Sequence, residues 1–403
     1  MMNKEGRNLA SVWVGIIFVI ILIGGIIIVA QNINLKKKFS KFQSPAYVWK
    51  AEELARISRK HHPDAVVVLN EEQGVWAKNV GLRIEMVQDL TLGEKDEDEH
   101  YVFYGGGDVI ADDAGNIYVL LRKEGVIRKF DAKGRYLLTI GREGQGPGEL
   151  LQPVRAVIDR RDVLHVIEYG NRRVSRFDLN GHYLGCTLVQ FQRIPRQFGV
   201  DDNGNYYISF LNEENGTVIH QFDAHGKLVK SFGEPLYLTR EIHFAERGSI
   251  VEDCSQGHIF ADQNFLYFCR WNPYDIRKYT YDGKLTMLIF RKNHFMPPKQ
   301  MRIIGRQDYL FVGSVHSSFL GNRNDQLICL ISVPEIIYKE INIGWIVDIF
   351  DLNGNLLTSY QSPLEFYPTF MDNHNRIYGF SGDLTRIYRF TMKITRPKSN
   401  ERR

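Results

Sequence analysis

The sequence has few cysteines and no strong excess of either charge. The four cysteines, Cys186, Cys254, Cys269 and Cys329, are far apart and form no Cys-x-x-Cys pair. Their spacing therefore predicts neither a zinc knuckle nor a disulfide framework, and four packed thiols are expected. Cys254 and Cys269 would form a bridge only if the fold brought them together. The net charge is only +4 over 403 residues, which argues against a nucleic-acid partner.

The sequence also lacks the common enzyme motifs. No Gly-x-Ser-x-Gly elbow occurs, which excludes an α/β-hydrolase. The glycine-rich stretch TIGREGQGPGELLQP at residues 139–153 is not a P-loop, because Pro147 stands where lysine is required and a strand-like segment follows. The acidic stretch EKDEDEH at residues 94–100 lacks the glycine and distal glutamate of an EF-hand. We therefore predict no catalytic residue, metal ligand or cofactor, and we expect the glycine-rich stretch to join two repeats.

One long apolar run stands near the start of the chain. Residues 9–30 carry no charge and are mostly Ile, Val and Leu, long enough to span a bilayer as a helix. The run exceeds the usual length of a signal-peptide core, and Val-Ala-Gln is a poor cleavage site, so an uncleaved single-pass anchor is expected. Taken literally, the positive-inside rule applied to Lys36, Lys37 and Lys38 would keep the rest of the chain in the cytoplasm.

The remaining boundaries follow from composition. A short tail occupies residues 1–8, and the polar residues 31–80 are expected to form a flexible linker or stalk. Removing residues 31–70 should then leave the fold intact. A folded domain is expected from residue 82 to residue 392, followed by a polar tail at residues 393–403.

The domain is built from repeats. Segments such as VIRKFDAKGRYLLTIG (residues 126–141) and VIHQFDAHGKLVKSFG (residues 218–233) place Asp and then Gly between alternating apolar residues. This pattern predicts a β-hairpin in which Asp caps the turn and Gly takes a positive φ. The turn glycines are expected at Gly134, Gly181, Gly226, Gly283 and Gly354.

A second hairpin precedes each copy. VIADDAGNIYVL (residues 109–120) is the clearest example, and VEDCSQGHIFA (residues 251–261) is a looser one. Two hairpins per unit make four antiparallel strands, and four strands repeated about every 45 residues make the blade of a β-propeller. Six blades are predicted, with first strands near 105, 153, 195, 248, 300 and 363. Seven blades are the alternative, because the long interval between Gly283 and Gly354 leaves room for an insertion.

The two ends of the domain are expected to close the ring. The last unit ends after residues 386–392 with three strands, and residues 82–93 form one spare strand at the start. An open propeller would expose a sheet edge, which natural proteins avoid. The spare strand should therefore complete the last blade.

The repeat core EYGNRRVSRFD (residues 168–178) and the glycine-rich joints resemble the NHL-repeat and related six-bladed propellers of bacterial extracytoplasmic, membrane-associated proteins. The resemblance covers residues 82–392 and implies a propeller that faces outward from the membrane. Where that family has Asp, this sequence has Glu168.

Antiparallel order separates two faces of the ring. Turns after strands one and three are short, whereas loops after strands two and four are long and irregular, and function concentrates on variable loops. The residues expected to bind a partner on this long-loop face are Arg122, Arg142, Arg172, Arg173, Arg270, Trp271 and Tyr274. Positions facing the channel are expected to be mainly apolar or glycine, with no carboxylate recurring in every unit.

Two functions remain open. The first is a membrane-anchored binding or scaffolding module for a protein, peptide or glycan. The alternative is a propeller enzyme of the lactonase or lyase kind, and calcium at the channel mouth is expected only under this alternative, because its chemistry needs converging carboxylates.

Overall fold

The computed structural model describes most of the chain after residue 46. The described residues are 47–49, 51–79, 81–93, 98–103, 107–195, 197–212, 216–234, 257–270, 274–292, 299–303, 309–312, 316–323, 325–333 and 342–395. The anchor predicted at residues 9–30 and the tail predicted at residues 393–403, apart from its first three residues, lie outside them. Within the described ranges, no helix is long and apolar enough to cross a membrane.

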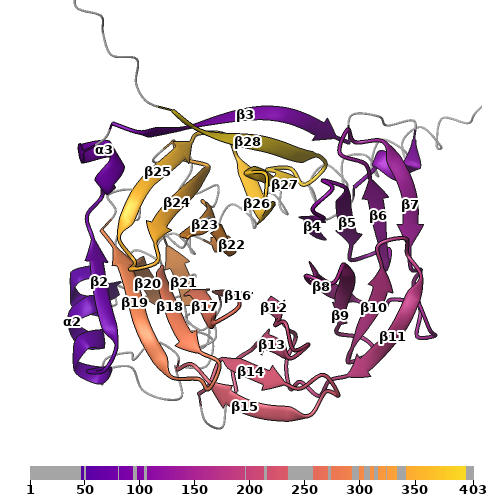
Figure 1. Ribbon diagram of the computed structural model, residues 1–403, viewed down its shortest axis with the longest axis horizontal. Coiled ribbons are helices and arrows are strands. Elements are labelled where there is room, and N and C mark those ends of the chain that lie inside the picture. The colour runs from indigo at the N-terminus through magenta and orange to yellow at the C-terminus, as the bar shows by residue number, and fades with distance from the viewer. Residues whose placement is uncertain are drawn as a thin grey trace, which may run out of the picture. The chain divides into compact units, whose positions relative to one another are not determined.

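The first three blades are four-stranded antiparallel sheets, each formed by consecutive strands (Figure 1). Blade 1 contains β4 (Gly107–Ala111), β5 (Ile117–Leu121), β6 (Val126–Phe130) and β7 (Tyr136–Ile140). Blade 2 contains β8 (Pro153–Ile158), β9 (Val163–Glu168), β10 (Arg173–Asp178) and β11 (Tyr183–Leu188). Blade 3 contains β12 (Gln197–Val200), β13 (Tyr206–Ser209), β14 (Ile219–Phe222) and β15 (Leu228–Phe232).

The other three blades depend partly on residues from the N-terminal side. Blade 4 contains β16 (Gly257–Ala261), β17 (Phe265–Arg270), β18 (Asp275–Thr280) and β19 (Leu285–Arg291), and β2 (Val66–Asn70) adds a fifth strand parallel to β19. Blade 5 contains β22 (His316–Arg323), β23 (Gln326–Ser332), β24 (Trp345–Asp351) and β25 (Leu356–Ser362). Blade 6 contains β26 (Phe366–Met371), β27 (Arg376–Ser381), β28 (Ile387–Thr395) and β3 (Arg83–Leu92).

The innermost strands form a closed ring. Each of β4, β8, β12, β16, β22 and β26 contacts the next, and β26 contacts β4 (Figure 1). The described chain therefore forms a six-bladed propeller, and the seven-blade alternative is wrong. The first strand of blade 5 begins at His316 rather than near residue 300, and that of blade 4 at Gly257 rather than near 248. The hairpin assigned to residues 251–261 is thus misplaced, since the turn in blade 4 follows Ala261.

The strand near residue 300 belongs to a separate unit. β20 (Lys299–Ile303), β21 (Tyr309–Val312) and β1 (Tyr47–Trp49) form a three-stranded sheet. Of the described residues, Tyr47, 300–303 and 309–312 belong to this second compact unit. The interval between Gly283 and Gly354 does contain an insertion, as its length suggested.

The turn chemistry is as predicted. All five expected turn glycines have positive φ, between 80° and 89°. In the first of them, Asp131 Oδ1 accepts the backbone N–H groups of Lys133 and Arg135, both at 2.9 Å. Such a cap fixes the turn while Gly134 takes the left-handed conformation that a side chain disfavours.

Ring closure through the ends of the domain is confirmed. β3 pairs antiparallel with β28 over the length of both strands, from Ile387 opposite Leu92 to Thr395 opposite Arg83. Arg389 on β28 also donates from Nε to Asp89 Oδ1 at 2.8 Å. This pairing removes the open edge of the last blade.

The expected flexible linker is wrong for residues 51–79. Helix α2 (Ala51–His61) has Glu52 and Glu53 in its first turn and basic residues in its last, which suits the helix dipole, and it buries Leu54 and Ala55. It packs on β19, and helix α3 (Val75–Asn79) packs on β25. We call residues 51–92, which run from α2 to β3, the strap.

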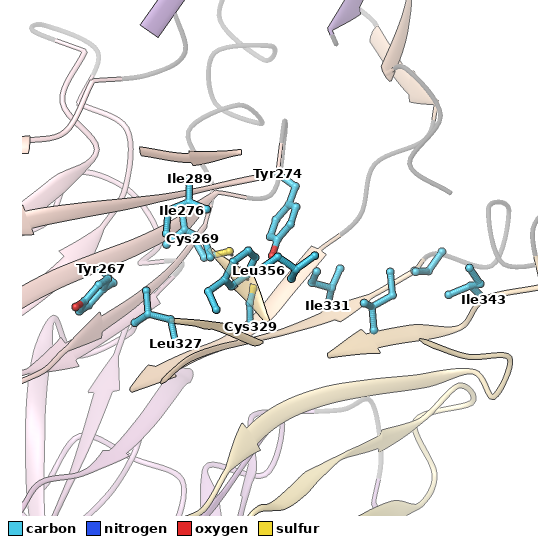
Figure 2. Packing of buried hydrophobic residues seen from close by; sticks show 13 residues of the cluster. Tyr267, Cys269, Tyr274, Ile276, Ile289, Leu327, Cys329, Ile331, Ile343 and Leu356 are labelled. Atoms are coloured by element: carbon cyan, nitrogen blue, oxygen red, sulfur yellow. Dashed lines mark hydrogen bonds between the residues drawn. The ribbon is translucent and has the colours of Figure 1, made fainter. Parts of the chain in front are cut away.

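The hydrophobic core lies between adjacent blades rather than inside one of them. One cluster joins blades 4 and 5 through Tyr267, Ile276, Leu327 and Ile346 among others (Figure 2). Another joins blades 5 and 6 around Trp345, whose side chain is fully buried. Each blade is therefore stabilised by burial of apolar area against its neighbours.

Candidate functional site

A cavity of about 1110 Å³ occupies the centre of the ring. The inner strands of the blades line it, together with the short turns that follow these strands. We call the end at these turns the mouth. Each inner strand runs toward the mouth, so its second residue lies deeper than its last.

A carboxylate recurs at the mouth. Asp112 Oδ1 accepts the backbone N–H of Asn116 at 2.8 Å, and its Oδ2 accepts the Tyr118 hydroxyl at 3.0 Å. Four other described blades have an aspartate that accepts a backbone N–H at the same position of the first turn. They are Asp159, Asp201, Asp262 and Asp372. The partner on strand two is Tyr207 for Asp201 and Tyr378 for Asp372, at 3.1 and 2.8 Å. The expectation was that no carboxylate recurs in every unit, and the described residues place this capping aspartate in five of the six blades.

These capping aspartates are used by the fold. Each holds a turn, and burial together with the adjacent carboxylate raises the pKa of Tyr118, Tyr207 and Tyr378, which keeps these hydroxyls protonated as donors. The residue that follows the capping aspartate in several turns does not cap the turn. Asp113 and Asp202 are exposed at the mouth, and Asp202 forms an ion pair with Arg160 at 3.2 Å.

The cavity has a negative balance of charge. Ten aspartates line its described wall, against three arginines and one lysine. A concave wall of one sign concentrates ions of the other sign inside it. The cavity should therefore attract positively charged groups, although the chain as a whole is slightly basic.

Four polar residues form a layer deep in the cavity, which we call the floor. Asp108, Arg155, Gln197 and His258 occupy equivalent positions on the inner strands of blades 1–4, opposite Leu120, Ile167, Ser209 and Cys269 of strand two. Asp108 Oδ1 lies 3.0 Å from Arg155 Nη1, which links blades 1 and 2. The floor is about 13 Å below the mouth, since Asp108 and Asp112 are four strand residues apart.

Asp108 and Gln197 of the floor are buried, Arg155 and His258 are half-buried, and not every polar atom of the floor is paired. The Gln197 side chain is 1 % exposed, and no acceptor for its Nε2 lies among the described residues. A buried donor without a partner is costly, which makes such a group a candidate for contact with a ligand. Burial, and secondarily the charge of Arg155, lowers the pKa of His258 to about 3. His258 is therefore neutral at physiological pH.

Aromatic rings line the wall between the floor and the mouth. They are Phe198, Phe260, Phe265, Tyr267 and Phe370. Lys278 Nζ lies 3.8 Å from the centroid of the Phe265 ring, and burial lowers the pKa of this lysine. The wall thus already holds one cation against an aromatic face.

The sequence did not predict the floor, although the inner-strand positions that line the cavity are mainly apolar or glycine, as expected. The four residues are chemically different and each stands alone in a short apolar strand, so no repeated motif marks them. The weak signal was one polar residue near the start of each inner strand, as in GDVIA and GHIFA.

The residues predicted to bind a partner divide into two groups. Arg122 and Arg172 are exposed on four-residue turns between strands two and three, at residues 122–125 and 169–172, which are not the long loops expected there. Arg142 is exposed on the longer joint between blades 1 and 2, and its Nε bonds Glu149 at 2.9 Å. Trp271 lies outside the described residues. The other three are buried, which corrects the expectation that they present themselves to a partner.

Arg173 holds the glycine-rich joint between blades 1 and 2. Its Nε donates to Glu168 Oε1 at 2.8 Å, and its Nη atoms donate to the backbone carbonyls of Gln145, Gly146 and Glu149 at 2.7–3.0 Å. Asn171 adds a bond to the carbonyl of Gly144 at 3.1 Å. The glycine-rich stretch is therefore a joint between repeats, as predicted, and Arg173 is one of the residues that fix it.

Arg270 and Tyr274 hold blade 4 in a related way. Arg270 pairs with Asp275, and both side chains are buried. The Tyr274 hydroxyl donates to Asp348 Oδ2 of blade 5 at 3.2 Å, and burial raises the pKa of Tyr274. Both residues stabilise the fold rather than a docking surface.

Within the described ranges, no group of three or more His, Cys, Asp or Glu side chains could hold a metal ion. The aspartates at the mouth are numerous, but each capping aspartate already accepts hydrogen bonds from its own turn.

Fold and channel together define a β-propeller of six blades. Residues 107–234 match the family described as "6-bladed beta-propeller". This match covers blades 1–3, and the narrower resemblance to NHL repeats is not tested by it. No curated protein matches the sequence.

Several solved structures have the same fold. A Bacteroides fragilis protein that has been proposed to be exported matches with a TM-score of 0.51 and 11 % identity, over 82 % of this chain and 100 % of its own. A member of the duf4221 family from Bacteroides vulgatus matches with a TM-score of 0.52 and 10 % identity, over 78 % and 99 %. Virginiamycin B lyase from Staphylococcus aureus matches at 0.45 and 13 %, over 77 % and 99 %, which carries no conclusion about catalysis.

Proposed function

We propose that this propeller is a binding module whose ligand enters the central cavity from the mouth. The observation that carries the proposal is the cavity itself: about 1110 Å³, with an acidic mouth, aromatic walls and a polar floor. Ligand sites in proteins are usually concave, mostly apolar, and equipped with a few convergent polar groups. This cavity is concave, has aromatic rings on its walls and convergent polar groups on its floor, and its mouth is polar.

The chemistry favours a peptide segment with basic side chains. Lysine and arginine carry apolar stems that suit the aromatic wall, and charged ends that suit the aspartates at the mouth. The contact between Lys278 and the Phe265 ring is an example of this arrangement within the chain. The unpartnered Gln197 Nε2 would donate to a carbonyl of the ligand that reaches the floor.

The predicted anchor at residues 9–30 remains part of the proposal. It rests on the sequence, and it would hold the module at a membrane with the propeller outside the cytoplasm. Exposed Arg122, Arg142 and Arg172 would then belong to the opposite, long-loop face rather than to the ligand site.

Calorimetric titration tests the proposal. We expect tetralysine to bind with an affinity that falls as salt is raised, while tetraglutamate and a neutral tetrasaccharide do not bind. The double variant Asp113→Asn/Asp202→Asn removes two exposed charges at the mouth without touching the capping aspartates, and it should weaken binding several-fold.

Asp64→Asn is the matched control, because Asp64 is an exposed aspartate of the strap and does not line the cavity. It should bind tetralysine as the unmodified protein does. Binding of the saccharide instead of tetralysine, or equal loss in both variants, would contradict the proposal.

A further inference from the structure

Two cysteines meet at the interface between blades 4 and 5. Cys269 lies on β17 and Cys329 on β23, which are the second strands of adjacent blades. Their Sγ atoms are 3.2 Å apart, and neither side chain has any exposed surface. Figure 2 shows both side chains inside the apolar cluster that joins the two blades.

This contact differs from what the sequence suggested. Cys269 was expected to bridge, if at all, with Cys254, which lies outside the described residues. Cys186 is exposed on β11, so the expectation of four packed thiols is wrong for that residue. Among the described cysteines, only Cys269 and Cys329 are in contact with each other.

We propose that Cys269 and Cys329 form a disulfide that cross-links blades 4 and 5. The sulfur atoms need to move only roughly 1 Å closer to reach the bonded distance of about 2 Å. The bond would join residues 60 apart in the sequence. The segment between them includes residues 300–312, which belong to the separate three-stranded unit.

The cross-link spans one of the two longest connections between described blades, the other being the connection from Phe232 to Gly257 between blades 3 and 4. Blades 1 and 2 are joined directly by the glycine-rich stretch, and blades 5 and 6 by the few residues between Ser362 and Phe366. By contrast, β19 ends at Arg291 and the next inner strand begins only at His316. A covalent bond across this joint would hold together two blades that are far apart along the chain.

The reaction is an ordinary thiol–disulfide exchange with a small-molecule disulfide or a disulfide oxidoreductase as the oxidant. The thiolate of one cysteine attacks the incoming disulfide and releases one thiol. The second thiolate then attacks the mixed disulfide and releases the other. Two protein thiols lose two protons and two electrons, and the reagent is reduced to two thiols.

Burial determines when this exchange can take place. The apolar surroundings raise the pKa of the Cys329 thiol, so the packed interface offers little thiolate for attack. Exchange should therefore occur before blades 4 and 5 pack together, or when they separate. Once formed, the bond should resist reductants as long as the protein stays folded.

Peptide mapping of the full-length protein tests the proposal. The protein is incubated with oxidised glutathione during refolding, unfolded in denaturant with iodoacetamide, and digested without reductant. We expect alkylation at Cys186 and Cys254 and a linked peptide pair containing Cys269 and Cys329. Alkylation of all four cysteines, or a bond between Cys269 and another partner, would overturn the proposal.

Thermal unfolding gives a second readout. It compares the oxidised and reduced forms of the same variant, so a packing defect of that variant affects both forms. The Tm of the unmodified protein should be at least about 5 °C higher in the oxidised form than in the reduced form. This difference should vanish in both Cys269→Ala and Cys329→Ala, and persist in Cys186→Ala. An oxidised–reduced difference that survives in Cys269→Ala would show that another bond causes it.

Discussion

Blades 1–3 and blades 4–6 are built in different ways. The first three blades are continuous in sequence, from β4 to β15, and every strand of each blade follows the last. Each of the other three receives a piece of the strap: β2 joins blade 4, α3 packs on blade 5, and β3 completes blade 6. The difference shows that a repeat can be locally complete, can carry an added element at its outer side as blades 4 and 5 do, or can borrow its last strand as blade 6 does.

The strap fits its blades closely. A Cβ on Gly74 would lie 2.2 Å from the carbonyl oxygen of Leu357 on β25, so only glycine fits there. The Asn70 side chain bonds the carbonyl of Gly354 and the N–H of Leu356, both at 2.8 Å, and thereby ties blade 4 to the last turn of blade 5. The sequence led to the expectation that residues 31–70 can be removed without loss of the fold. For residues 51–70 we now expect that removal destabilises the ring.

Deleting residues 82–92 should have the largest effect. Blade 6 would lose its outer strand and the ring its closure, so we expect loss of cooperative thermal unfolding, measured by circular dichroism, and aggregation through the open edge. The triple variant Glu85→Thr/Val87→Thr/Gln88→Thr alters only exposed side chains of β3 and should unfold normally. A deletion variant with an unchanged Tm would show that blade 6 does not need the strap.

Breaking the buried ion pair of blade 2 should come next. Glu168→Gln leaves Arg173 buried without its carboxylate, which should lower the free energy of unfolding by about 3–5 kcal/mol in urea denaturation. Blade 4 carries the pair with reversed polarity, Arg270 with Asp275, and Arg277 Nε lies 3.5 Å from the same carboxylate. Arg270→Met should therefore cost less than Glu168→Gln. The reverse order would show that Arg277 does not compensate for the loss of Arg270.

Asn70→Ala should lower the free energy of unfolding by about 2–4 kcal/mol, because it leaves a buried carbonyl and a buried N–H without partners. Asn180→Ala is the matched control in the continuous half, since Asn180 is exposed in a turn and its backbone N–H, not its side chain, bonds Asp178. Urea denaturation of both variants checks the prediction. Equal effects would indicate that Asn70 does not tie the two blades together.

Acid should weaken blade 3 through His220. Burial lowers the pKa of this histidine to about 4, below its usual value of 6.5, so its stabilising contribution is complete above pH 6.5 and is lost as the pH falls toward 4. At pH 5 the loss should be about 2 kcal/mol relative to pH 7.5. His220→Gln should show a smaller loss between these two values in urea denaturation, whereas the exposed His182→Gln should behave as the unmodified protein.

The continuous half is also the half that the sequence predicted well. Its turn residues, such as Asp131 and Gly134, recur because each hairpin turn needs a capping side chain and a residue with positive φ. The repeat can therefore be recognised in the sequence. The closing strand could be predicted as well, since a count of strands and the cost of an open edge need no knowledge of side-chain contacts.

The other half and the floor were harder to predict for physical reasons. The strap consists of short elements that are stable only against their blades, so residues 51–79 looked like a polar linker. Arg173, Arg270 and Tyr274 looked like surface residues because their position between strands two and three does not reveal their buried partners. Asp108 and Gln197 share a position in the fold but no chemistry, which hides them from any search for a motif.

The pairing of β3 with β28 also sets an order of events during synthesis. Asp89 leaves the ribosome 300 residues before Arg389, the residue that it pairs with. At ordinary rates of translation this interval lasts roughly 15–60 s. For that time the N-terminal strand has no partner, and the blades made in the meantime stand as an open arc. The nascent chain therefore carries an exposed strand at its leading end until the last blade is complete, and a ribosome that stalls before residue 387 would release a product unable to close.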